Sequence, residues 1–318
     1  MSKYRDDLPQ LKGGTYLTDG GMETTLIFHE GADLPHFAAF VLLAEPAGRK
    51  QLKDYYTRYL DIAAKGGTGF VLDTATWRTN PDWGAKLGYS AEALKAVNED
   101  AVELLSELRA AYERPGAPIV ISGAIGPRGD GYKAGNMDAA EAEAYHAAQI
   151  ETFAGTEADM VTAFTLTSID EAIGIARAAK RLNMPCAISF TVETDGNLVT
   201  GLTLRQAIEA VDAATGSYPH YYMINCAHPS HFDQVVTGDA AWLKRIGGIR
   251  ANASKMSHQQ LDESETLDAG DPADLGRRYL KLTRHMPQLR ILGGCCGTDH
   301  RHVAAICEAC VPATRLSA

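Results

Sequence analysis

The sequence lacks any long apolar stretch. No uninterrupted hydrophobic run approaches the roughly 18 residues that a membrane-spanning helix needs. Residues 1–7 are mostly polar and contain no apolar segment of the kind found in a secretory signal peptide. We therefore expect a cytoplasmic protein that has no membrane partner.

An excess of positive charge is also missing. The chain has 30 Lys and Arg residues against 40 Asp and Glu residues, which gives a formal net charge of -10. This sign opposes binding to nucleic-acid phosphates and favours neutral or cationic small molecules. We expect no nucleic-acid partner, and nothing in the sequence selects an oligomeric state.

Cysteine is too sparse for the disulfide framework of a small secreted domain. The 318 residues contain six cysteines, two of them adjacent. Reduced thiols that are free for metal binding or catalysis fit this usage better. The composition, 45% hydrophobic and 22% charged, is otherwise typical of a globular chain that buries a large core.

Linkers rich in proline or serine are absent, and no charge run divides the chain. Eight short apolar runs are instead spread along it. They cover Thr15 to Asp19, Gly69 to Asp73, Pro118 to Gly123, Asp159 to Ala163, Cys186 to Phe190, Tyr221 to Asn225, Ile246 to Arg250 and Arg290 to Gly294. Each run has the length and composition of a buried strand.

Helical patterns fill the intervals between these runs. The predicted helices are Arg49 to Lys65, Ala91 to Tyr112 and Ala139 to Gly155, with others that begin near Ser168, Thr203, His231, Asp271 and Thr298. Regular alternation of strand and helix predicts one (β/α)8 barrel over residues 1–318 rather than two doubly wound domains. The C-terminal ends of all eight strands would then meet at one face.

Three cysteines stand at predicted strand ends. Cys226 follows the sixth run, and Cys295 and Cys296 follow the eighth, inside Gly293-Gly294-Cys295-Cys296-Gly297. Three soft ligands with an open fourth position are typical of catalytic Zn²⁺, so we expect a zinc site on the C-terminal face. Consecutive strand residues point in opposite directions, so the backbone at Cys295 and Cys296 must be irregular, which the glycines allow.

These motifs resemble the homocysteine S-methyltransferase family. The matching segments are residues 18–24 (TDGGMET), 189–190 (SF), 195–198 (DGNL), 224–226 (INC) and 293–297 (GGCCG). The resemblance implies a zinc-dependent barrel enzyme in which Cys226, Cys295 and Cys296 hold the metal. It also implies transfer of a methyl group from a small-molecule donor to homocysteine, which gives methionine.

The chemistry explains why a metal is useful, because only the thiolate of an acceptor attacks carbon well. Coordination to zinc would deprotonate and position the acceptor sulfur, so we expect no catalytic residue beyond the zinc site. The donor needs a good leaving group, such as a sulfonium or a quaternary ammonium. Aromatic faces bind such cations, and Trp77, Tyr132 and Phe164 are candidates on predicted loops of this face.

Further substrate contacts are expected from the opening motif and from Asn225, which precedes the upstream cysteine. The backbone amides of Gly20 and Gly21 could hold a substrate carboxylate, and Asp19 could orient the loop or contact the amino end of the substrate. Glycines that only shape a turn are the alternative.

The chain departs from the family at one position. The family places Glu-Thr after the fourth strand, where the carboxylate meets the amino group of the acceptor, but this chain has Phe164-Thr165. Either another acid substitutes, with Glu193 a candidate on the loop after the fifth run, or the acceptor is a different thiol. Glu193 as an ordinary solvated loop residue is the alternative.

A non-catalytic protein with a structural zinc site is the alternative hypothesis. Cys295, Cys296, Cys307 and Cys310 could form a closed structural zinc site. Cys307 and Cys310 are spaced to line one face of a predicted helix, where packing is the simpler role.

Overall fold

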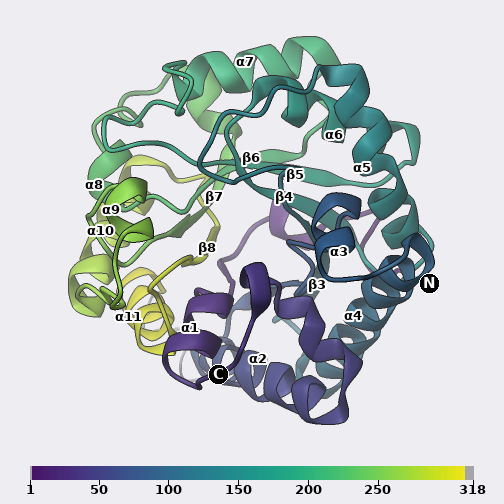
Figure 1. The fold of residues 1–318 in the computed structure, drawn as a ribbon. Helices are drawn as coiled ribbons and strands as arrows, with labels where there is room; N and C mark the ends of the chain where they lie inside the picture. Colours follow the sequence, from purple (N-terminus) through teal and green to yellow (C-terminus); the bar gives the residue numbers. More distant parts are fainter. Residues whose placement is uncertain (1, 312–318) are drawn as a thin grey trace.

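The computed structural model describes residues 2–311. Its eight parallel strands pair in chain order, and β8 closes on β1, so the sheet is a barrel with the helices around it (Figure 1). The strands are β1 (Tyr16–Leu17), β2 (Gly69–Asp73), β3 (Ile119–Ile125), β4 (Met160–Leu166), β5 (Cys186–Phe190), β6 (Tyr221–Asn225), β7 (Ile246–Ala251) and β8 (Ile291–Gly294). The predicted (β/α)8 fold and all eight predicted strands are confirmed.

Helices connect the strands and cover the barrel. The α-helices are α1 (Met22–Phe28), α2 (Pro46–Gly66), α3 (Pro81–Lys86), α4 (Ala91–Tyr112), α5 (Ala139–Ala154), α6 (Ile169–Arg181), α7 (Leu204–Thr215), α8 (Pro229–Phe232), α9 (His258–Asp262), α10 (Pro272–His285) and α11 (His300–Cys310). Short 3-10 helices add η1 (Pro9–Leu11), η2 (Pro35–Phe37), η3 (Ala39–Ala44) and η4 (Ala241–Arg245). Among the described residues, no helix is both long and apolar enough to cross a membrane.

The prediction fails in one βα unit. A full helix was expected from about His231, but α8 ends at Phe232 and only the 3-10 turn η4 precedes β7. Gly238 lies between them at φ 90°, a conformation that a continuing α-helix does not allow. The connection after β6 is therefore mostly loop.

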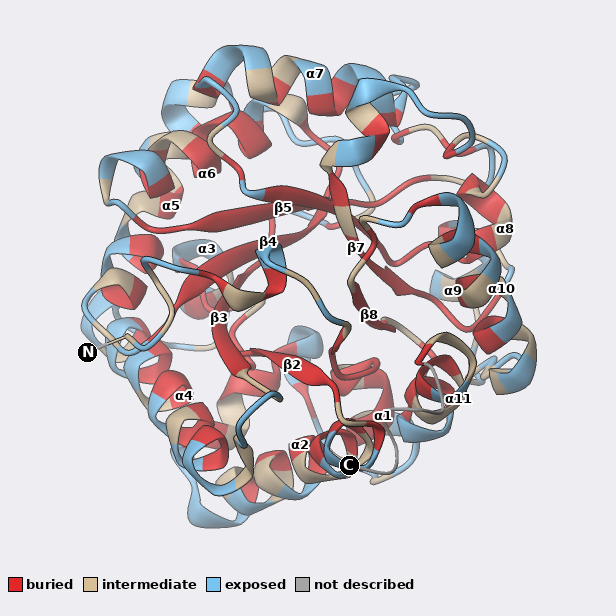
Figure 2. Cartoon of the chain, turned by 180° about the vertical axis from the view of Figure 1, so that it is seen from behind, coloured by how far each residue is buried: buried red, intermediate tan, exposed pale blue. Residues whose placement is uncertain are grey.

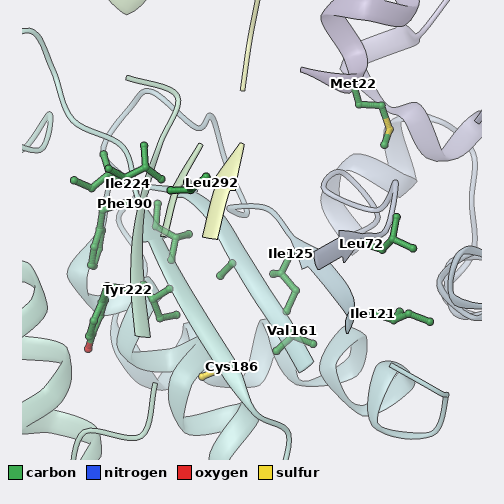
Figure 3. Packing of buried hydrophobic residues seen from close by; sticks show 14 of the residues in the cluster. Met22, Leu72, Ile121, Ile125, Val161, Cys186, Phe190, Tyr222, Ile224 and Leu292 are labelled. Carbon is green, nitrogen blue, oxygen red and sulfur yellow. The ribbon is translucent and has the colours of Figure 1, made fainter. Parts of the chain in front are cut away.

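The core has two layers because successive strand residues point to opposite sides of the sheet. Tyr16, Val71 and Val120 pack inside the barrel, whereas their neighbours join the larger cluster between the sheet and the helices. Figure 2 shows the buried strands enclosed by helices that expose only their outer faces. Figure 3 shows part of the outer layer, in which Leu72 and Ile121 belong to one cluster.

Candidate metal centre

Three cysteine sulfurs meet at the C-terminal end of the barrel. Cys226 follows β6, while Cys295 and Cys296 follow β8, and the three Sγ atoms lie within 4.8 Å of one another. Within residues 2–311, this is the one group of cysteine, histidine or acidic side chains that is arranged to hold a metal ion. Cys226 and Cys295 are joined as a disulfide, with 5.3 Å between their Cα atoms, and Cys296 is free.

The backbone at the cysteines is irregular, as their spacing requires. Strand β8 ends at Gly294, and Cys295 and Cys296 lie in the turn that follows, which the Thr298 amide closes by donating to the Cys295 carbonyl at 3.1 Å. Cys226 has φ 54°, in the left-handed region that non-glycine residues rarely adopt. Leaving the strand geometry is what lets all three sulfurs face one point.

The opening glycine motif packs directly against this turn. A Cβ atom on Gly21 would lie 2.5 Å from the Cys295 carbonyl oxygen, so no larger residue fits there without moving the cysteine backbone. The Gly21 amide donates to the Thr298 carbonyl at 3.0 Å. That amide is therefore occupied, which corrects the expectation that both glycine amides are available to a substrate carboxylate.

Asn225 holds the sulfurs rather than presenting a free amide to a substrate. Its side-chain nitrogen donates to Thr165 Oγ1 at 2.9 Å and to Cys226 Sγ at 3.2 Å. Its oxygen accepts from the Thr165 amide at 2.9 Å and from the Ser189 hydroxyl at 2.6 Å. These bonds tie the ends of β4, β5 and β6 together beneath the cysteine cluster. Asn225 also lines the cavity at the mouth of the barrel, as a substrate contact would.

A buried charged network lies beside the cysteines. The Arg250 guanidinium, at the end of β7, donates to Asp19 Oδ1 and to Asp73 Oδ2, each at 2.6 Å. The second Asp19 oxygen accepts from the Tyr55 hydroxyl at 2.9 Å. Both oxygens of Asp19 are thus engaged inside the protein, which fits the expected role in orienting the loop. Arg250 and Asp73 were not predicted, although each is a charged residue that ends an apolar run.

The site forms a cavity of about 100 Å³ at the mouth of the barrel. Its lining residues are Asp19, Gly20, Gly21, Met22, Glu23, Asp73, Thr74, Ala75, Trp77, Ala124, Tyr132, Phe164, Thr165, Asn225, Cys226, Arg250, Cys295 and Cys296. The structure therefore brings together every predicted site residue except Glu193. Glu23, in the first turn of α1, is an additional acid that sequence reasoning missed.

Burial shifts the pKa values of the titratable side chains that line this cavity. Desolvation raises the pKa of the Cys296 thiol to about 11, and the Glu23 carboxylate acts in the same direction. Burial likewise raises the pKa of Glu23 to about 7 and that of Asp73 to about 7, although Arg250 opposes the shift of Asp73. A buried thiol of this kind becomes a thiolate readily only beside a cation, and three clustered sulfurs suit a soft metal ion.

The three predicted aromatic residues all line the cavity. The Tyr132 hydroxyl lies 3.9 Å from Cys296 Sγ. Two of the rings already face internal cations, since the Arg250 guanidinium carbon lies 5.1 Å from the Phe164 centroid and that of Arg78 lies 3.9 Å from the Trp77 centroid. Part of the cation-binding capacity expected of these rings is thus used within the protein.

Glu193 does not line the cavity. Its carboxylate faces His258, with 3.1 Å between Oε1 and Nδ1, and the other ring nitrogen of His258 donates to the Cys226 carbonyl at 2.6 Å. This position does not favour Glu193 as the substitute for the missing carboxylate and agrees with the alternative of an ordinary loop residue. Its partner His258, which sequence reasoning missed, supports the strained Cys226 backbone.

The four-cysteine alternative also disagrees with the geometry. Cys307 and Cys310 lie on α11 and take no part in the metal-ligating group of the described residues. Cys307 is buried where α11 meets α2, so close that a Cβ on Gly66 would lie 2.5 Å from its sulfur. Packing, the simpler of the two expected roles, explains its position.

Comparison with known proteins agrees with this arrangement. Residues 16–310 match the family model for homocysteine S-methyltransferase. The homocysteine S-methyltransferase of Escherichia coli K12 is 26% identical over 313 residues, which covers 91% of this chain and 93% of the relative.

Solved structures of the E. coli homocysteine methyltransferase MmuM share the fold. Its metallated form has a TM-score of 0.70 at 21% identity, with 93% of this chain and 96% of that chain covered. Its oxidized form has a TM-score of 0.71 at 22% identity, with 96% and 99% covered. The cysteine cluster at the barrel mouth and the match along nearly the whole sequence lead to one conclusion: the chain belongs to the homocysteine S-methyltransferase family of methyltransferases.

Proposed function

We propose that this protein is a zinc-dependent S-methyltransferase that methylates homocysteine and gives methionine. The donor would be a small sulfonium or quaternary ammonium compound. The observation that carries the proposal is the convergence of Cys226, Cys295 and Cys296 within 4.8 Å inside a cavity at the barrel mouth. This ligand set fits zinc because thiolates are soft donors and three protein ligands leave a position for the acceptor.

The metal would be held by the reduced form of the three cysteines. When bound, zinc supplies Lewis acidity that favours the thiolate form of the acceptor at neutral pH. Asn225 stabilises negative charge on Cys226 through its side-chain amide. His258 fixes the Cys226 backbone through the carbonyl. These two residues position the cysteine before any substrate arrives.

The cavity walls supply the remaining functions. Trp77, Tyr132 and Phe164 line the same cavity as the cysteine sulfurs and would exclude water from a bound substrate, which favours attack of a thiolate on a methyl group. Trp77 and Tyr132 would receive the cationic donor on the ring faces that Arg78 and His258 leave uncovered. The Gly20 amide, together with the Asp19 loop, would receive the substrate carboxylate, since the Gly21 amide is already used.

One observation favours a thiol acceptor other than homocysteine as the alternative. Phe164 occupies the position of the family's amino-binding glutamate, so the end of β4 lacks the expected carboxylate. The Phe164 ring packs against Arg250 instead. A thiol without an amino group would tolerate this change. Methylation of such a thiol is the alternative function, and it uses the same metal site. The cytoplasmic location expected from the sequence stays a prediction.

The test is methyl transfer by the reduced, zinc-loaded protein. Homocysteine would be offered with S-methylmethionine, S-adenosylmethionine and betaine in turn, and methionine would be detected by mass spectrometry. The same donors would be offered with 4-mercaptobutanoate, which lacks the amino group. Methionine formation with any donor supports the proposal. Methylation of the deaminated thiol alone would establish the alternative, and no methylation of either thiol would refute both.

A further inference from the structure

The cavity is lined by more carboxyl groups than cationic side chains. Asp19, Glu23 and Asp73 line it, and Arg250 is the one Lys or Arg among its lining residues. Arg250 is fully engaged with Asp19 and Asp73. In their ionised forms the three carboxylates carry more negative charge than one guanidinium balances, and the burial of Asp19 and Asp73 strengthens their attraction for a bound cation.

Asp73 has an oxygen that lacks a partner. Oδ2 accepts from Arg250 at 2.6 Å, but Oδ1 is buried and makes no hydrogen bond of acceptable geometry within the described part of the chain. The Ser122 hydroxyl is near enough to lower the Asp73 pKa, but it pairs with the Thr162 hydroxyl at 2.8 Å. Asp73 is only 5% exposed, and it lines the cavity. A buried acceptor is nearly always satisfied in a folded protein, so this oxygen points to a donor that arrives with a ligand.

Glu23 reaches the same cavity from the first turn of α1. The arginines whose charges act on it, Arg250 and Arg78, are held elsewhere. Arg78 lies between two indole rings, with its guanidinium carbon 3.9 Å from the centroid of Trp77 and 3.9 Å from that of Trp83. Both arginines act on Glu23 only at longer range, and no ion pair joins Glu23 to a Lys, Arg or His side chain among residues 2–311.

We propose that Glu23 and Oδ1 of Asp73 form a cation site that binds the ammonium group of the thiol acceptor. The proposal rests on the proposed function and deepens it. It explains how the neutral Phe164 can stand where the family has a glutamate, since the negative charge is supplied instead from α1 and β2. The Phe164 ring then provides an aromatic face against which the Arg250 guanidinium packs. A cationic methyl donor shares the chemistry that this site would recognise.

The experiment measures binding rather than turnover. Calorimetric titration of the reduced, zinc-loaded full chain would use three probes: L-methionine, 4-(methylthio)butanoate, which lacks only the amino group, and trimethylsulfonium. Glu23→Gln keeps the shape of the side chain and removes its charge. Glu103→Gln, exposed on α4, is the matched control. Circular dichroism and the unfolding midpoint would verify that each variant is folded.

The expected result is a loss of about 10-fold or more in the affinity of Glu23→Gln for L-methionine, as for a lost hydrogen bond to a charged group. Affinity for 4-(methylthio)butanoate should stay within about twofold, and Glu103→Gln should match the unmodified chain for every probe. Asp73→Asn should weaken L-methionine in the same selective way. A loss confined to trimethylsulfonium, with L-methionine unchanged, would overturn the assignment to the acceptor, because the two acids would then bind the cationic donor instead.

Two results would overturn the proposal while leaving the proposed function intact. One is unchanged binding of L-methionine by both variants. The other is an equal loss for L-methionine and its deaminated analogue, because the acids would then act on shape rather than on charge. Failure of the unmodified chain to bind any of the three probes would overturn the proposed function together with this inference.

Discussion

The side-chain amide of Asn225 donates to the sulfur of the next residue, Cys226, across 3.2 Å. The donor and the acceptor are adjacent in sequence, yet their contact depends on the left-handed backbone of Cys226 at φ 54°. An extended residue would turn its side chain to the opposite face of the sheet. The approach of the Cys226 sulfur to the other two cysteines therefore depends on a backbone conformation as well as on residue type.

Removal of Cys226 should abolish stoichiometric zinc binding. Cys226→Ala deletes one of three clustered ligands, and two cysteines in one turn cannot complete a stable site alone. Zinc would be measured by atomic emission after purification under reducing conditions. Cys310→Ala, which lies outside the cluster on α11, should keep one zinc per chain. Full zinc in Cys226→Ala would reject the three-cysteine site.

Asn225→Ala should weaken both the fold and the metal site. The Thr165 amide and the Ser189 hydroxyl would lose a buried acceptor, which should lower the free energy of unfolding by about 1–3 kcal/mol. Loss of the amide that orients Cys226 should reduce zinc affinity by about 10- to 100-fold. Urea unfolding and a competing chelator would measure the two effects. Asn136→Ala, at an exposed loop position, is the control and should change neither.

Arg250→Met should be strongly destabilising. The change leaves Asp19 and Asp73 buried without their shared cation, a loss of about 3–5 kcal/mol in the free energy of unfolding. The deficit should shrink as the pH is lowered, because the two acids can then become neutral. Urea unfolding of the metal-free, reduced chain would test this. Arg205→Met breaks only the exposed pair with Glu209 and should change stability by less than about 1 kcal/mol.

Glu23 should make stability depend on pH. Desolvation raises its pKa from the usual 4.5 to about 7, so the folded state holds the Glu23 proton more tightly than the unfolded state. Its contribution to stability is complete below about pH 4.5 and is lost as the pH rises through about 7. The free energy of unfolding should therefore fall in the unmodified chain relative to Glu23→Gln over this range.

The measurement is urea unfolding of both metal-free, reduced proteins at several pH values from 4.5 to 8. The comparison cancels the contribution of Asp73, since its raised pKa is present in both chains. A difference between the two proteins that stays constant across this range would show that Glu23 is not desolvated in the cavity.

Gly21→Ala should disturb the cysteine turn. The added methyl group would lie 2.5 Å from the Cys295 carbonyl oxygen, which belongs to the backbone and cannot rotate away. We expect a loss of about 1–3 kcal/mol in the free energy of unfolding, as for other overpacked sites, with weaker zinc binding. Gly129→Ala, where a Cβ meets nothing within 4 Å, should leave both quantities nearly unchanged. Equal behaviour of the two variants would refute the tight packing of the glycine motif against the cysteines.

Much of this protein can be predicted from local sequence pattern. Strands β2, β5 and β6 and the helix α4 have the predicted bounds, because short apolar runs and helical capping residues are local signals. The positions of Cys226, Cys295 and Cys296 at strand ends then followed from barrel topology, which gathers those ends at one face. The failure after β6 is local too, since α8 stops early and a left-handed Gly238 follows it.

Only the tertiary structure decided how the cavity is charged. Arg250 donates hydrogen bonds to Asp73 and Asp19, which lie 177 and 231 residues away in sequence. The local periodicity of the sequence cannot predict such a contact. The position of Glu23 is likewise not recorded in any local pattern. Helix α1 begins directly after Gly21, which packs on Cys295, and this contact places Glu23 at the cavity. Sequence alone determined the barrel and the placement of the three cysteines at strand ends, because these depend on residue type and strand order. The partner of each charge depends on which side chains the closed barrel brings within about 3 Å, and that is settled only when the chain folds.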